Sequence, residues 1–404
     1  MRGLLKRIMV MAILAALVFC DLARPIQTEA ASKEYRAFWF AFYDYDDYRS
    51  SYSRRSEETF RTYFAKVCNN GKKRGMNRVL VHVRPFGDAM YRSRYFPWSA
   101  CISGKQGRNP GYDPLKIMVE VAHSKGLKIE AWINPYRVAS GTTNYGKLSP
   151  KNLARIWHNT SGKQRNVLAY NGALYYNPSK KEVRTLIVRG VKEIVRNYNV
   201  DGIHMDDYFY PSFSQGNVRT AFDGPEYRKS AFRKAGKSVA QYRRHQVNIL
   251  VRRLHSAVKS IRPSCTFGIS PAGSIENLVS PYSYYVDINT WLNSKSYVDY
   301  ICPQIYWGFK HPYAKYNRVL NQWARKARSH KVKLYVGIGV YKAGYNTGAS
   351  SAERSEWRNN TNLLKNMVLY GRKHGARGFA FFDYSDLVGR PGRKAVAKLV
   401  KVLK

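Results

Sequence analysis

Short runs of β-branched and aromatic residues recur along the chain, each ending in polar, proline or glycine positions. A stretch with helical periodicity follows most of these runs, which is the pattern of alternating strands and helices. The predicted strands are Arg36–Tyr43, Arg78–Arg84, Lys128–Asn134, Gly202–Tyr208, Thr266–Ser270, Tyr300–Tyr306, Leu334–Tyr341 and Gly378–Tyr384. The predicted helices include Glu57–Arg74, Pro114–Lys125, Val183–Tyr198, Tyr242–Ile261, Leu320–His330 and Glu356–His374.

Alternating strands and helices imply a parallel sheet joined by helical crossovers. The chain has no glycine fingerprint of a dinucleotide-binding fold, so a closed barrel is favoured over an open sheet. We therefore predict a single α/β domain over residues 31–404, a (β/α)8 TIM barrel. Its long loops, Arg137–Tyr176 and Tyr210–Gln241, follow strands 3 and 4. Both leave the end of the barrel where active sites lie.

Residues 1–30 have the pattern of a secretory signal peptide. Three basic residues come first, Arg2, Lys6 and Arg7. The apolar run Ile8–Phe19 that follows is too short to span a membrane comfortably, and cleavage is expected after Ala30. A lipid anchor at Cys20 is an alternative, which the bulky Phe19 before it disfavours. The expected location is extracellular or in the cell wall, and no other stretch is apolar enough to span a membrane.

The charge balance is strongly basic. The chain holds 69 Lys and Arg against 26 Asp and Glu, a formal net charge of +43. Such a surface attracts polyanions. For a secreted protein we expect an anionic cell-wall polymer or acidic polysaccharide as the partner, and no nucleic acid. The basic residues are spread along the whole length, which favours a general surface bias over a dedicated binding arm.

The cysteines show no CxxC spacing, so a structural zinc site is not expected. Cys265 and Cys302 fall on neighbouring predicted strands, where buried free thiols are favoured over a disulfide. No cofactor is expected.

The fourth predicted strand carries the clearest chemical signal. Side chains alternate along a strand, so Ile203 and Met205 should face the helices, whereas His204 and Asp206 should face the barrel lumen. Asp206 then lies at the mouth of the barrel, with Asp207 beside it. A buried carboxylate is costly unless it is paired or functional. The alternative is a structural role, in which Asp206 caps the next helix or pairs with an arginine. The Tyr and Pro residues that follow do not resemble the start of a helix, which disfavours it.

The other strand ends carry a polar and aromatic set that suits a sugar ring, which has apolar faces and a rim of hydroxyls. Any one of these residues could instead have a structural role. Trp132 or Trp307 could pack in the core, and Arg84 could form a buried ion pair. Together they predict a carbohydrate site at the mouth. The predicted substrate-binding residues are Arg84, Asp88, Trp132, Asn134, Tyr136, Arg137, His204, Tyr208, Gln304, Tyr306, Trp307 and Asp383.

Glycoside hydrolysis usually needs two carboxyl groups, one as acid and one as nucleophile or base. Asp206 is the first candidate, and Asp207 is predicted with it as catalytic. Asp88 and Asp383 are alternatives for the second group, because the fifth and sixth strand ends carry no carboxylate. Adjacent carboxylates would raise one pKa, which can keep a proton donor protonated at neutral pH.

Several stretches resemble the glycosyl-hydrolase-like 10 family of secreted bacterial proteins across about residues 34–385. They are residues 83–89, 97–99, 113–115, 131–137, 201–211, 267–271 and 303–307. The resemblance implies a (β/α)8 barrel with a glycosidase-like role outside the cytoplasm. Some relatives look like enzymes that cut peptidoglycan glycan strands stripped of peptides.

The family's paired aspartates correspond to Asp206 and Asp207. Its other pocket residues correspond to Arg84, Asp88, Asn134, Tyr136, Arg137, Gln304 and Tyr306. Glu130 stands where the family has a histidine. By strand alternation its side chain should face the lumen, deeper in the barrel than Trp132 and Asn134, where it could shift the pKa of pocket groups.

Two other functions compete with a glycosidase. A non-catalytic carbohydrate-binding or cell-wall-binding barrel would explain the missing carboxylates and the positive charge. Hydrolysis of an ester or amide is the other, although no Gly-x-Ser-x-Gly motif occurs. His82, His204 and the aspartate pair could also bind a metal, which is a minor alternative.

Overall fold

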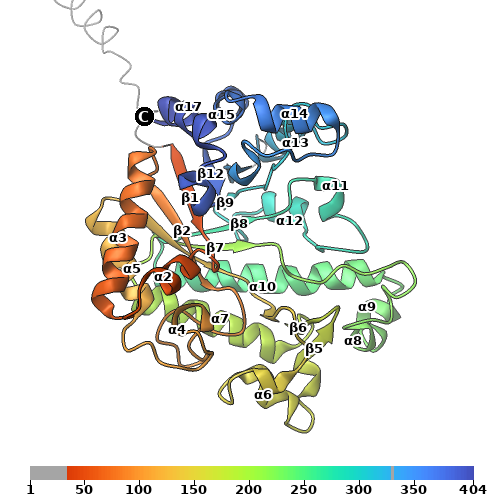
Figure 1. Ribbon diagram of the computed structural model, residues 1–404. Coiled ribbons are helices and arrows are strands. Elements are labelled where there is room, and N and C mark those ends of the chain that lie inside the picture. Colours follow the sequence, from red (N-terminus) through yellow and green to blue (C-terminus); the bar gives the residue numbers. More distant parts are fainter. Residues whose placement is uncertain (1–33, 329–331) are drawn as a thin grey trace, which may run out of the picture. The chain divides into compact units, whose positions relative to one another are not determined.

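The computed structural model describes residues 34–328 and 332–404, and the predicted signal segment lies outside them. Residues Tyr35–Lys404 form one compact unit. Its parallel sheet contains β1 (Tyr35–Phe40), β2 (Arg78–Arg84), β3 (Lys128–Ile133), β7 (Gly202–Asp206), β8 (Thr266–Ser270), β9 (Tyr300–Ile301), β10 (Lys333–Leu334), β11 (Val336–Gly339) and β12 (Gly378–Phe382) (Figure 1).

The sheet closes through a broken seventh strand. Its order is β10-β9-β8-β7-β3-β2-β1-β12-β11. Only Tyr335 separates β10, which pairs with β9, from β11, which pairs with β12. The two segments thus occupy one position of the ring, and the predicted (β/α)8 barrel is confirmed. At the break, Tyr335 stacks on Tyr35 of β1, with ring centroids 3.9 Å apart.

Long helices follow the strands, and their starts match recognisable capping signals. They are α3 (Glu57–Lys73), α5 (Pro114–Ser124), α7 (Lys181–Asn197), α10 (Val239–Ile261), α13 (Tyr316–Arg328), α14 (Ser351–Asn359), α15 (Leu363–Lys373) and α17 (Arg393–Leu403). Ser56 and Ser238 form capping boxes at α3 and α10, and Asp113 caps α5. No helix in the described part of the chain is long and apolar enough to cross a membrane.

The prediction of a single helix over Glu356–His374 is wrong, because α14 and α15 are two separate helices. Asn360, between them, has an extended backbone. Its side-chain oxygen accepts the N–H of Asn362 at 3.0 Å. Asparagine side chains compete with the helical hydrogen-bond ladder in this way, and periodicity alone does not show it.

Shorter elements occupy the connections. They are α2 (Tyr45–Ser51), α4 (Ala100–Ser103), α6 (Leu153–His158), α8 (Gly224–Arg228), α9 (Ala231–Lys234), α11 (Ile275–Leu278), α12 (Ile288–Leu292), α16 (Tyr384–Val388) and the 3-10 turns at 145–147, 164–166 and 340–342. The predicted loop after strand 3 also contains an antiparallel sheet of β4 (Arg137–Ala139), β6 (Ala173–Tyr176) and β5 (Val167–Tyr170). With α6, β5 and β6 lie outside the ring of strands (Figure 1).

Side-chain alternation divides the core into two layers. Ile203 and Met205 pack in the layer between the sheet and the helices, as predicted. The lumen holds a separate layer that includes Trp39, Trp132 and Tyr300. Cys265 and Cys302 are buried free thiols.

An ion pair lies in the lower lumen, below the aromatic layer. Arg78 contacts Glu130 at 3.0 Å, and the Glu130 side chain is completely buried. The Tyr300 hydroxyl donates a hydrogen bond to the same carboxylate. Glu130 therefore faces the lumen as predicted, but its partners are the groups of the lower lumen.

We expect Glu130→Ala to lower the free energy of unfolding by about 3–5 kcal/mol, because Arg78 would keep its charge in the lumen without a partner. Glu57→Ala removes an exposed pair with Arg61 and is the control, expected to cost at most about 1 kcal/mol. Denaturant unfolding measures both. Equal, small losses would show that the lumen pair does not matter to stability.

Candidate active site

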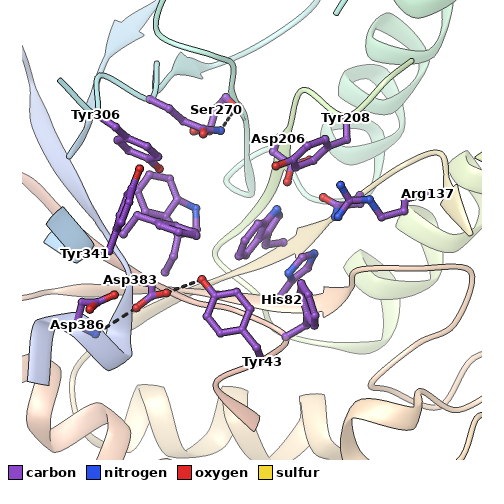
Figure 2. A pocket seen from close by; sticks show the side chains of 16 residues that line it. Tyr43, His82, Arg137, Asp206, Tyr208, Ser270, Tyr306, Tyr341, Asp383 and Asp386 are labelled. Carbon is purple, nitrogen blue, oxygen red and sulfur yellow. Dashed lines mark hydrogen bonds between the residues drawn. The ribbon is translucent and has the colours of Figure 1, made fainter. Parts of the chain in front are cut away.

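A cavity of about 400 Å³ opens at the carboxyl ends of the barrel strands. Its lining comes from the ends of all eight barrel positions and from the residues just beyond them (Figure 2). The lining residues are Trp39, Phe42, Tyr43, His82, Trp132, Asn134, Arg137, Asp206, Tyr208, Ser270, Gln304, Tyr306, Tyr341, Phe382, Asp383 and Asp386. The barrel thus gathers side chains that are far apart in sequence at one mouth.

Many predicted site residues meet in this cavity. Asp206, Trp132, Asn134, Arg137, Tyr208, Gln304, Tyr306 and Asp383 all line it. The lining does not include Asp207, Arg84, Asp88, Tyr136, His204 and Trp307.

Arg84 lies behind the cavity wall because the strand alternation is interrupted. The register between β2 and β3 shifts between His82 and Arg84. Arg84 consequently turns away from the lumen, and its guanidinium lies 4.7 Å from the centroid of the Phe96 ring. Our prediction assumed regular alternation, and a bulge of this kind leaves no signature in residue types.

Of three other predicted residues, two are buried and Trp307 is partly buried. Asp88 is buried and accepts a hydrogen bond from Gln106 at 3.0 Å. Tyr136 is completely buried in the layer between sheet and helices. Trp307 packs against the same layer, next to His311.

His204 lies beneath the cavity floor. The Trp39 indole N–H donates to its Nε2 at 3.1 Å, so Nδ1 carries the proton and donates to the Tyr300 hydroxyl at 2.8 Å. Burial lowers the pKa of His204 to about 3, which keeps the ring neutral. His204 therefore fixes the orientation of Trp39, which lines the cavity.

Asp206 ends β7 at the cavity wall with 3% of its surface exposed. Burial raises its pKa well above the usual range, and the neighbouring Asp207 adds to this shift while Arg137 opposes it. Its Oδ1 is buried and has no hydrogen-bond partner in the described part of the protein. Burial thus favours the protonated form of the Asp206 carboxyl.

Asp207 has a different environment. One of its oxygens accepts the backbone N–H of Ala272 at 2.7 Å. Burial raises its pKa to about 7, and hydrogen bonds to backbone N–H groups oppose the rise. Asp207 thus affects the cavity indirectly, because its negative charge raises the pKa of Asp206.

Other lining atoms also lack partners among the described residues. They are both ring nitrogens of His82, the indole nitrogen of Trp132 and Oδ1 of Asn134. His82 and Trp132 stack with ring centroids 3.6 Å apart, and burial lowers the pKa of His82 well below its usual value. Buried polar atoms normally have hydrogen-bond partners. These donors and acceptors belong to residues that line the cavity.

A second pair of carboxyl groups lies across the cavity from Asp206 (Figure 2). Asp383 accepts hydrogen bonds from the hydroxyls of Tyr43 and Ser385 and from the backbone N–H of Asp386. Burial, and then the charge of Asp383, raise the pKa of Asp386 to about 6. Asp386 is therefore mostly ionised at neutral pH.

Sequence reasoning missed Trp39, Phe42, Tyr43, Phe382 and Asp386 as site residues. All come from the ends of β1 and β12 or from α16. The rule that strand ends carry the site applied there too, but the sequence analysis did not include these mostly aromatic residues in the site. Asp386 lies past the strand, on a short helix that its sequence pattern did not predict.

Aromatic rings form much of the cavity wall. Tyr341 and Phe382 pack edge to face, and Tyr306 packs against both. Arg137 lies 4.1 Å from the centroid of the Tyr208 ring. Among the described residues, no group of three or more His, Cys, Asp or Glu side chains is placed to hold a metal ion.

Comparison of the fold shows similarity to glycoside hydrolases. The glycoside hydrolase domain of PgaB (BpsB) from Bordetella bronchiseptica superposes with a TM-score of 0.57 at 14% identity. The match covers 92% of this chain and 99% of that domain. At this identity the similarity establishes the TIM-barrel fold alone.

Sequence comparison establishes the family. Glycosyl hydrolase YngK of Bacillus subtilis (strain 168) is 34% identical over 382 residues, covering 91% of this chain and 71% of YngK. Glycosyl hydrolase DigH of Escherichia coli (strain K12) is 36% identical over 294 residues, covering 67% of this chain and 63% of DigH. The family described as glycosyl hydrolase-like 10 matches residues 34–355. The chain belongs to the glycosyl hydrolase-like 10 family.

Proposed function

We propose that this protein is a secreted glycoside hydrolase that cleaves a glycosidic bond in a bacterial cell-wall or related polysaccharide, with peptide-free peptidoglycan strands as the substrate. The observation that carries the proposal is the buried Asp206, which has a raised pKa and a partnerless oxygen in a cavity large enough for sugar rings. The names of YngK and DigH, both glycosyl hydrolases, support the reaction class.

Asp206 is the proton donor in this proposal. A general acid must be protonated at the working pH and must reach the leaving-group oxygen. The raised pKa supports the first condition, and the place of Asp206 in the cavity lining supports the second. The sequence placed Asp207 in a catalytic role as well. We assign it to positioning, because it does not line the cavity and acts through the pKa of Asp206.

Asp386 is the proposed second carboxylate. Glycosidases hold two carboxyl groups on either side of the scissile bond. Asp386 faces Asp206 across the cavity and is mostly ionised at neutral pH, as a base or nucleophile requires (Figure 2). Asp383 is engaged by Tyr43, Ser385 and a backbone N–H, which suits a residue that holds Asp386 in place.

The substrate proposal rests on the mixture of groups around the cavity. Aromatic faces such as Tyr306 suit sugar rings. Arg137 adds a cation that suits an acidic sugar substituent. Removing the peptides from peptidoglycan leaves a free carboxylate on the lactyl group of every second sugar, so peptide-free strands combine both features.

A non-catalytic carbohydrate-binding barrel is the second candidate. The ends of β8 and β9 contribute Ser270 and Gln304 to the cavity, and no carboxylate comes from either position. The same cavity would then hold a glycan without cleaving it.

We expect Asp206→Asn to reduce the release of new reducing ends from peptide-free glycan strands by at least about 100-fold, because the proton donor is lost. Mass spectrometry of the products measures the effect, and a pull-down measures glycan binding, which should persist. Asp47→Asn, at an exposed position, is the control and should be fully active.

Turnover by Asp206→Asn equal to that of the wild type would refute the role of Asp206. Glycan binding without products from the wild type would favour the non-catalytic barrel.

The pH profile tests the role of Asp207. We expect wild-type activity to rise near pH 6 as Asp386 ionises, and to fall at higher pH as Asp206 loses its proton. A negative Asp207 disfavours ionisation of Asp206, so Asp207→Asn should lower the pKa of Asp206 and shift the falling limb to lower pH. The rising limb should stay in place. A falling limb at the wild-type position would show that Asp207 does not act through Asp206.

A further inference from the structure

A basic groove lies on the outside of the barrel and shares no lining residue with the cavity. It consists of two adjoining depressions of about 540 Å³ and about 210 Å³ that share Arg94 and Tyr95. One side of the groove is the segment that follows β2, and another is α7. Its basic residues are Arg92, Arg94, Lys151, Arg189, Lys192 and Arg196. None of them lines the cavity that contains Asp206.

The six basic side chains of the groove outnumber its one acidic lining residue, Glu193. No ion pair involves any of its six basic side chains in the part of the chain that the structure describes. Five of them are exposed and Lys192 is half-buried. Several like charges around one depression repel each other, and a bound polyanion would relieve that repulsion.

Glu193 is the acidic residue of the groove, and it has a structural task. It is buried and accepts hydrogen bonds from the backbone N–H of Arg94, at 2.8 Å, and from the Ser93 hydroxyl. Phe96 also packs against α7, where a Cβ on Gly190 would lie 2.6 Å from its ring. These contacts fix the segment after β2 on α7, so the groove is formed before any ligand arrives.

Aromatic rings accompany the charges. Tyr95 and Trp98 line the groove and are half-buried, so part of each ring remains accessible. Arginine predominates among the basic residues, and its planar guanidinium binds carboxylates in a bidentate manner. Aromatic faces beside carboxylate-binding groups suit a polymer of sugar rings that carry acidic substituents.

We propose that the basic groove is a second binding site, for an acidic polysaccharide whose sugar rings bear carboxylates. Peptide-free peptidoglycan strands meet this description through their lactyl carboxylates. The groove would hold a distant part of a long polymer while another part, or another chain, occupies the cavity. Binding in the groove does not require that Asp206 cleaves anything.

The test compares two triple variants with the same net charge. Arg94→Gln, Lys192→Gln and Arg196→Gln together remove charge from the groove. Arg325→Gln, Lys394→Gln and Lys401→Gln together remove the same charge from exposed positions on α13 and α17. The probe is polygalacturonate, a polymer of sugar carboxylates, and titration calorimetry at low and high salt measures its affinity.

We expect the groove variant to bind polygalacturonate about ten-fold more weakly than the control variant, with a smaller salt dependence. Thermal melting should show both variants folded, because five of the six substituted side chains are exposed and Lys192 is only half-buried. Cleavage of a short soluble glycan fragment, if the wild type cleaves it, should be unchanged in both. Equal affinities of the groove and control variants would overturn the proposal.

Two further measurements address the kind of ligand. Tyr95→Ala should weaken polygalacturonate binding but leave the binding of inorganic polyphosphate, which has no rings, unchanged. Equal losses for both polymers would refute the contact between Tyr95 and sugar rings. If the groove variant loses affinity for single-stranded poly(dT) but keeps its affinity for polygalacturonate, the site binds nucleic acid and the assignment to a polysaccharide is wrong.

Discussion

The burial of one carboxyl group, that of Asp206, is the constraint on which the site depends. A carboxyl whose pKa is raised on folding costs stability above its unfolded pKa. The cost grows with pH up to the folded pKa and keeps its full size at higher pH. Burial supplies most of this shift, and Asp207 at the next position adds to it. Other polar groups in the lumen have partners, with Glu130 against Arg78 and His204 between Trp39 and Tyr300.

The charges of the protein are arranged on two scales. Inside the cavity, burial favours the protonated form of Asp206, whereas Asp386 across from it is mostly ionised, and the proposed acid–base cleavage needs this asymmetry. Outside, the excess of Lys and Arg gives a surface that attracts anionic polymers. The basic groove concentrates that attraction on a preformed surface with accessible rings. Both scales fit an acidic glycan better than a neutral one.

Sequence patterns predicted the barrel because a strand buried on both faces and a helix buried on one have distinct periodicities. Parity placed Ile203 and Met205 outside and His204 and Asp206 inside, since β7 is regular. The same rule failed for Arg84, where the register shift in β2 depends on tertiary packing. Asp386 could not be predicted because its place in the cavity depends on the position of α16 in the folded protein. Periodicity predicted one helix where the structure has two, because it does not show the side-chain hydrogen bond of Asn360.

The central claim is that Asp206 stays protonated at neutral pH, and a carbon-13 NMR titration of the aspartate side-chain carboxyls tests it most directly. The resonance that disappears in Asp206→Asn identifies the group. Our account predicts that this resonance titrates above pH 7 in the wild-type protein, well separated from those of exposed aspartates. Titration near pH 4, the range of an ordinary aspartate, would contradict the assignment of Asp206 as proton donor.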